Sequence, residues 1–158
     1  MQAAPNILNT LNSVLTTELT SINRYFLHAR MYRNWGFENL NNVSFKKSIK
    51  DMKQADELIE RILMLGGLPN LQKLEALHIG ENTQEMLACD EKFQIQQVAQ
   101  LKDAVAVCET AQDYVSRNIL NDLLAYEEDY LDWIETQQQL ISTTGAENYL
   151  QSQISKGE

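Results

Sequence analysis

The sequence has 158 residues, of which 44% are hydrophobic and 22% charged, the size and composition of one ordinary globular domain. Its formal net charge of -9 argues against a nucleic-acid-binding surface, because such surfaces are basic. The first residues lack the basic segment and apolar core of a secretory signal, and no apolar run is long enough to span a membrane. We therefore expect a cytoplasmic protein with a single domain over residues 1–158 and with neither nucleic acid nor membrane as a partner.

Apolar residues recur at spacings of three and four through long parts of the chain, a periodicity that predicts amphipathic helices. The predicted helices cover about residues 5–35, 43–65, 83–110 and 113–142, with a short terminal helix at about 148–154. Glycines stand where three of these helices should stop, at Gly36, Gly66 and Gly145. Asp113 is a suitable N-terminal cap for the fourth helix.

Residues 68–82 interrupt the helical rhythm with a proline and a glycine. At about fifteen residues this connection is longer than the usual link between bundle helices, so it can run the whole length of a bundle. Two helical hairpins joined by one long crossover are typical of the ferritin-like bundle. The sequence therefore predicts an all-α, ferritin-like four-helix bundle with a long crossover between the second and third helices and a short C-terminal fifth helix.

A bundle of this type builds a metal site from side chains on facing helices. The candidates, taken along the chain, are Glu18, Asp51, Gln54, Gln94, Glu127 and Tyr130. Asp51 and Gln54 stand three apart, so they share one helix face. Met52 lies roughly 100° further round the same helix and faces a different neighbour. The second helix could thus carry a metal site inside the bundle and a thioether ligand outside it, although a lone methionine is more often core filler.

Several long segments closely resemble bacterioferritin, and the resemblance extends over the entire chain. The matching segments are ELTSINRYFLHARMYRNWG (18–36), IERILMLGGLPNLQ (59–72), QDYVSRN (112–118), DWIE (132–135) and NYLQSQI (148–154). The resemblance implies a ferritin-type cage of 24 subunits built from dimers. It also implies a di-iron ferroxidase site within each subunit and a b-type haem held between two methionines at each twofold dimer interface.

The family's ligand pattern is only partly kept. That pattern has glutamate at positions 18, 51, 94 and 127 and histidine at positions 54 and 130, whereas this chain has Glu18, Asp51, Gln54, Gln94, Glu127 and Tyr130. Three acids without imidazole are a poor ligand set for two divalent irons, so we expect non-haem iron to be weak or absent. Lys47 precedes Asp51 by four residues, and we hypothesise that its ammonium replaces part of the missing metal charge. A solvated lysine on the cavity side is the alternative.

The haem position, in contrast, is kept. Met52 falls on the family's haem methionine within a matching frame, and the resemblance makes it the expected haem-iron ligand. Residues at suitable helical offsets could form a flat apolar pocket beside it, namely Ile22, Asn23, Phe26, Phe45 and Ile49. Thioether ligation favours Fe(II) and raises the reduction potential, which suits a redox relay between a cage interior and an external reductant.

Three functional interpretations follow from this pattern. The preferred one is an iron-storage cage subunit that binds haem b through Met52, has an impaired di-iron site and co-assembles with a second, ferroxidase-active subunit. A ferredoxin-type protein would serve as reductant. The second is an active ferroxidase with a reduced ligand set, and the third is a purely structural shell subunit. A DNA-binding mini-ferritin is disfavoured by the charge of -9 and by the predicted fifth helix.

Overall fold

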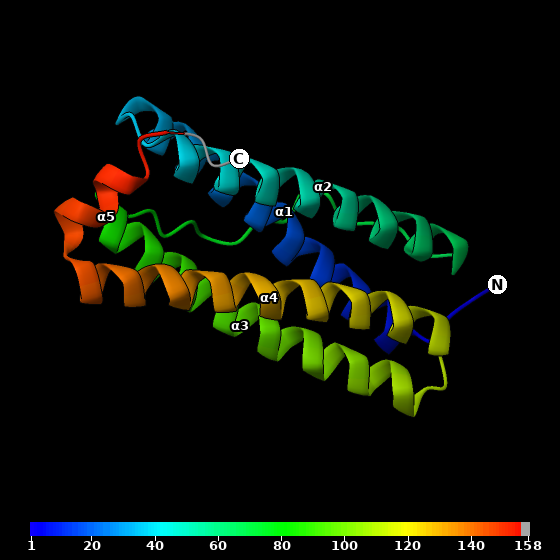
Figure 1. Cartoon of the computed structure of the whole chain (residues 1–158). Coiled ribbons are helices and arrows are strands. Elements are labelled where there is room, and N and C mark those ends of the chain that lie inside the picture. The colour runs from blue at the N-terminus through cyan, green and yellow to red at the C-terminus, as the bar shows by residue number, and fades with distance from the viewer. Residues whose placement is uncertain (156–158) are drawn as a thin grey trace.

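The computed structural model describes residues 1–155, and their regular structure is entirely helical (Figure 1). The helices are α1 (Pro5–Asn34), α2 (Glu38–Met64), α3 (Thr83–Thr110), α4 (Tyr114–Thr144) and α5 (Ala146–Ser152). The predicted four-helix bundle with a short fifth helix is therefore confirmed. None of the described helices combines the length and hydropathy that a membrane crossing requires.

The helix boundaries follow local chemistry. Pro5 occupies the first turn of α1, where its missing N–H costs no hydrogen bond. The side chain of Asn82 caps α3 by accepting from the N–H of Glu85, and Asp113 caps α4 in the same way. Gly145 adopts a φ of 88°, and this left-handed turn separates α4 from α5.

Three predicted boundaries need correction. The second helix begins at Glu38, ahead of the apolar periodicity that predicted its start near residue 43, because its first turns carry mostly polar side chains. α4 continues to Thr144 instead of stopping near residue 142. α5 covers Ala146–Ser152, two residues before the predicted range, because Gly145 is both the end of α4 and the cap position of α5.

The helices pair as two antiparallel hairpins, α1 with α2 and α3 with α4 (Figure 1). The crossover between α2 and α3 returns along the length of the bundle, as its expected length allowed. Hydrogen bonds fix it to α1: Arg24 donates to the His78 carbonyl at 2.9 Å, and Asn12 accepts from the backbone N–H of Asn70 at 2.8 Å. α5 packs across one end of the bundle, where Tyr149 is buried in an apolar cluster.

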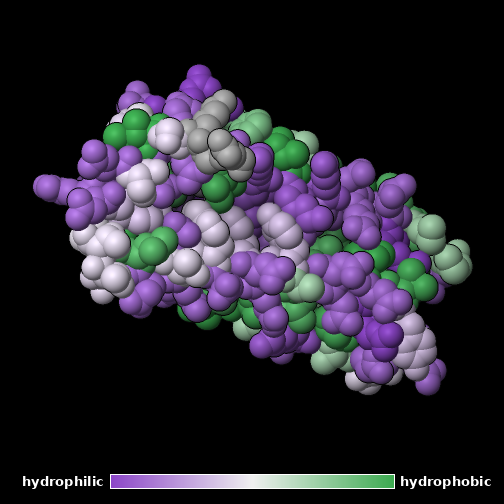
Figure 2. Space-filling view, in the orientation of Figure 1, coloured by the Kyte–Doolittle hydropathy of each residue, from purple (hydrophilic) through white to green (hydrophobic). Residues whose placement is uncertain are grey.

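The buried side chains of the bundle change from apolar to polar and back along the bundle axis. One end holds a large apolar cluster that includes Leu11, Leu58 and Leu101, and a smaller cluster beyond the middle contains Tyr25 and Tyr130. Between these clusters each of the four long helices contributes buried polar side chains. On the outside, hydrophobic patches are separated by hydrophilic side chains over the face that Figure 2 presents. This layer of buried polar side chains is the candidate functional site inside the bundle.

Candidate functional site

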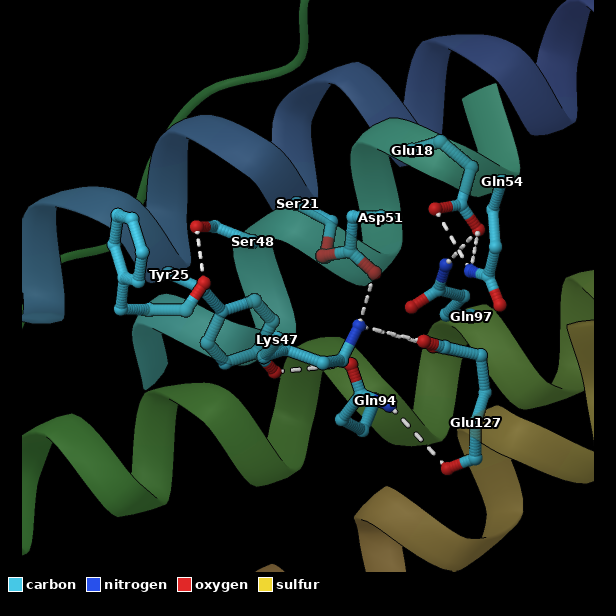
Figure 3. Close-up of polar contacts among 11 residues, drawn as sticks. Glu18, Ser21, Tyr25, Lys47, Ser48, Asp51, Gln54, Gln94, Gln97 and Glu127 are labelled. Atoms are coloured by element: carbon cyan, nitrogen blue, oxygen red, sulfur yellow. Dashed lines mark hydrogen bonds and ion pairs between the residues drawn. The ribbon is translucent and has the colours of Figure 1, made fainter. Parts of the chain in front are cut away.

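All six positions chosen from the sequence lie inside the bundle in this polar layer. Glu18, Asp51, Gln94 and Glu127 are fully buried, and Gln54 and Tyr130 are nearly so. They come from all four long helices, and five of them are labelled in Figure 3. The structure therefore brings together the positions that the sequence placed on facing helices.

A lysine stands at the centre of this layer. The Lys47 side chain is fully buried, and its Nζ lies 2.6 Å from Oε1 and 3.1 Å from Oε2 of Glu127. The same nitrogen also donates to Asp51, one turn further along α2 (Figure 3). The hypothesis that the Lys47 ammonium lies beside Asp51 is confirmed, and the alternative of a solvated lysine is wrong. One ammonium thus joins carboxylates from α2 and α4.

Aromatic rings enclose the ammonium. Its nitrogen lies 4.9 Å from the ring centre of Tyr25, 5.3 Å from that of Tyr126 and 5.2 Å from that of Tyr130. Ring faces attract cations at such distances, and more strongly where water is excluded. Tyr130 therefore contributes a ring face at the position where the family pattern has an imidazole.

The remaining acid, Glu18, accepts hydrogen bonds from amide side chains. Gln54 donates through Nε2 to both oxygens of Glu18 at 3.1 Å, and Gln97 donates to Oε1 of Glu18 at 3.0 Å. Gln94 accepts from the Tyr25 hydroxyl at 2.9 Å and donates to the backbone carbonyl of Glu127 at 3.4 Å. A buried carboxylate needs hydrogen-bond donors, and here uncharged side chains supply them.

Burial and mutual repulsion shift the pKa values of the buried acids. Burial, reinforced by Asp51 and Glu127, raises the pKa of Glu18 well above its ordinary value. Burial also raises the pKa of Asp51 to about 7, although Lys47 opposes the shift. For Lys47 itself burial disfavours the charge, but Asp51 and Glu127 outweigh burial and raise the pKa above that of a free lysine. Lys47 is therefore an ammonium at neutral pH.

These residues do not fit a pair of iron ions in the arrangement observed. The oxygens of Asp51 and Glu127 that face the centre accept from an ammonium, and those of Glu18 accept from amide N–H groups. Within residues 1–155, no three His, Cys, Asp or Glu side chains are arranged to hold a metal ion together. Residual binding of one iron by Glu18, Asp51 and Glu127 remains a prediction.

The opposite face of α2 is apolar and open. Met52 is 54% exposed, and Phe26 of α1 and Ile49 of α2 are 48% and 37% exposed. Ile22 and Phe45 are half-buried, and Asn23 is exposed. The Phe26 and Phe45 ring centres lie 6.4 Å apart, and the Arg30 guanidinium lies 5.3 Å and 4.8 Å from them. An accessible thioether beside exposed aromatic and aliphatic side chains suits a flat apolar group with a soft iron centre, so these residues fit a haem.

Sequence reasoning missed four side chains of the interior site: Tyr25, whose ring and hydroxyl are described above, and Ser21, Gln97 and Tyr126. Ser21 donates to Asp51, Gln97 donates to Glu18, and Tyr126 contributes a ring beside the ammonium. Helical spacing contained part of the signal, because Ser21 follows Glu18 by three positions and Gln97 follows Gln94 by three. Nothing in that spacing distinguishes a buried polar side chain from a solvated one.

Comparison with known proteins agrees with this architecture. Residues 8–144 match the ferritin-like domain family. The chain is 38% identical to the bacterioferritin of Mycobacterium avium over 156 residues, covering 99% of this chain and 98% of that protein. It is 41% identical to the bacterial ferritin of Synechocystis sp. over 156 residues, covering 98% and 100% of the two chains. The bacterioferritin of Brucella melitensis is 38% identical over 149 residues, covering 94% of this chain and 92% of that protein.

Proposed function

Because the chain belongs to the bacterioferritin family of ferritin-like proteins, we propose that it is an iron-storage cage subunit that binds haem through Met52 and oxidises iron poorly by itself. The observation that carries this proposal is the contrast within one helix. The interior face of α2 is closed by Lys47, whereas the exterior face presents an exposed thioether in an apolar surface.

The haem assignment rests on exposure and shape. A methionine that is 54% exposed contributes little to the core, so core packing does not account for Met52. Ile49 lies on the same helix, and Phe26 with Phe45 extends the apolar surface across the α1–α2 hairpin. Two copies of this surface around a twofold axis would enclose one haem, and the Met52 thioether of each copy would be available to hold its iron. When bound, the haem would supply a centre that carries one electron.

The weak-ferroxidase assignment rests on the ligand chemistry. Divalent iron prefers carboxylates and imidazole, and three of the six family positions here carry Gln54, Gln94 and Tyr130. The acids that remain already have protein partners. We therefore place this chain beside a second subunit type that oxidises iron, in a mixed ferritin-type cage, with an external ferredoxin-type reductant feeding electrons to the haem.

A haem titration tests the proposal directly. Added to the purified protein, haem is expected to give a saturable Soret band at one haem per two chains. Met52→Leu should abolish that band, because leucine keeps the side-chain volume and removes the sulfur ligand. Met64→Leu is the matched control, since Met64 is also an exposed methionine on α2 and is 57% exposed. Equal haem uptake by the Met52→Leu variant and the wild type would contradict the proposal.

Iron oxidation is the second test. The chain purified alone should oxidise Fe(II) at the rate of the protein-free buffer, with either O2 or peroxide as oxidant. Rapid oxidation would instead support an active ferroxidase with a reduced ligand set. Absence of haem uptake together with absence of oxidation would support a purely structural shell subunit.

A further inference from the structure

We infer that Lys47 is a resident counter-ion that excludes divalent metal from the bundle, so that restoring the missing ligands does not by itself restore metal binding. The inference deepens the proposed function, since it treats the polar layer as the place where the family pattern puts metal. It adds that the Lys47 ammonium itself keeps metal ions out of this layer. Metal binding can be prevented by the loss of ligands or by an ammonium that occupies the site, and mutations can distinguish these two causes.

The position of the ammonium gives the first argument. Lys47 Nζ lies between Asp51 of α2 and Glu127 of α4, with contacts to both carboxylates (Figure 3). A cation held jointly by these two acids would have to lie where this nitrogen lies, because hard cations bind carboxylate oxygens at about 2.0–2.6 Å. Entry of a divalent ion therefore requires the lysine to leave first.

The cost of that departure gives the second argument. Lys47 is fully buried, so moving its ammonium outward removes the one cation among residues 1–155 that contacts Asp51 and Glu127. Separating a buried ion pair leaves uncompensated charge and is strongly unfavourable. It also gives up the contacts with the rings of Tyr25, Tyr126 and Tyr130. An entering metal has to offset these losses before it gains any affinity.

The altered positions give the third argument, because they act as one set. Asp51 is one methylene shorter than the glutamate of the family pattern, which leaves space for an ammonium beside it. Tyr130 replaces an imidazole and supplies a ring face to the same ammonium at 5.2 Å. Gln54 replaces the second imidazole and supplies N–H donors to Glu18. Asp51 and Tyr130 thus contact a protein ammonium where the family pattern has metal ligands, and Gln54 gives Glu18 hydrogen-bond donors in place of a metal.

The experiment compares two variants that share a restored ligand set, Gln54→His, Gln94→Glu and Tyr130→His. The first keeps Lys47 and carries Lys53→Ala, so that both have the same net charge; the second carries Lys47→Ala. Lys53 is an exposed lysine on the same helix. Co(II) is the probe, and its binding is followed by its visible absorption and by calorimetry. Adding Asp51→Asn to the second variant identifies binding in the interior.

We expect the variant that lacks Lys47 to bind Co(II) at least tenfold more tightly than the variant that keeps it. We also expect Asp51→Asn to abolish the gain. Equal affinities in the two variants, including no binding by either, would overturn the inference. Haem uptake is measured on the same samples. Its loss would count against the proposed function alone, because the haem surface lies on the opposite face of α2.

A measurement on the unmodified protein avoids any folding defect of the variants. Acetic anhydride acetylates exposed amines, and mass spectrometry of the digested protein reports each lysine. In the folded chain Lys47 should react at least tenfold more slowly than Lys46 or Lys50, both in the absence of Co(II) and at a millimolar concentration of it. Lys47 reacting as fast as Lys50, or becoming reactive when Co(II) is added, would show that the ammonium is readily displaced and would overturn the inference.

Discussion

The two faces of α2 differ in whether their side chains find partners within the same chain. On the interior face, the charge of Lys47 is met by Asp51 and Glu127 within the same chain. On the exterior face, Met52 and Ile49 of α2 and Phe26 of α1 are left exposed. The interior is complete in one subunit, whereas the exterior is complete only when something covers it. In the proposed function one helix has lost a metal site and kept a haem site, which is possible because neighbouring residues along it face different surroundings.

Replacing the buried cation should have the largest effect on stability. Lys47→Met keeps most of the side-chain volume but leaves Asp51 and Glu127 buried without a cation. We expect a loss of about 3–5 kcal/mol in the free energy of unfolding, measured by urea denaturation at fixed protein concentration. Lys53→Met, at an exposed position of the same helix, should change it by no more than about 0.5 kcal/mol. Equal effects of the two substitutions would remove the distinction between the faces.

The buried acids predict an unusual pH dependence. Burial raises the pKa of Asp51 from an ordinary value of 3.8 to about 7, so between these values the folded chain holds a proton that the unfolded chain has released. The contribution of Asp51 to stability therefore falls as pH rises from about 4 to 7, by up to about 1.4 kcal/mol per pH unit. Glu18, whose pKa is also raised, acts in the same direction.

Urea denaturation at several pH values checks this dependence. Asp51→Asn should make the profile between pH 4 and 7 less steep, because asparagine cannot titrate and only the contribution of Glu18 remains. Asp129→Asn, which alters an exposed acid on α4, is the matched control and should leave the slope in place. An Asp51→Asn profile that still falls as steeply as that of the wild type would show that Asp51 is not its source.

Loss of an amide donor should have a smaller effect. Gln54→Leu removes the two contacts of 3.1 Å to Glu18 and leaves Gln97 as its remaining amide donor. Because a buried acceptor then lacks a partner, we expect a loss of about 1–3 kcal/mol in the free energy of unfolding. Gln84→Leu, at an exposed position of α3, is the control. A neutral Gln54→Leu variant would indicate that Glu18 does not depend on this amide.

The exterior face should show the smallest effect on folding. Ile49 is 37% exposed, so Ile49→Ser is expected to lower the free energy of unfolding of the subunit by only about 1 kcal/mol. The same variant should weaken haem binding, because it places a hydroxyl on the proposed apolar surface. Denaturation and haem titration of one sample measure both quantities. A large loss of stability with unchanged haem affinity would reverse the assignment of this face.

The sequence predicted the fold well, because its signals were local. Regular apolar spacing, glycines at the helix ends and the long crossover predicted four long helices and their order. The terminal helix was shifted by two residues, since the role of Gly145 as its cap position was not recognised. Helical spacing also placed Lys47 on the same face as Asp51. The rings that enclose its ammonium come from Tyr25 on α1 and from Tyr126 and Tyr130 on α4, and spacing within one helix cannot predict such convergence.

The most direct test of the two faces is an anomalous difference map at the iron edge, from crystals of haem-loaded protein soaked in Fe(II). We predict an iron peak beside the sulfur of Met52 and no peak between Asp51 and Glu127, where the Lys47 ammonium lies. An iron peak between Asp51 and Glu127, or the absence of a peak at Met52, would contradict the account.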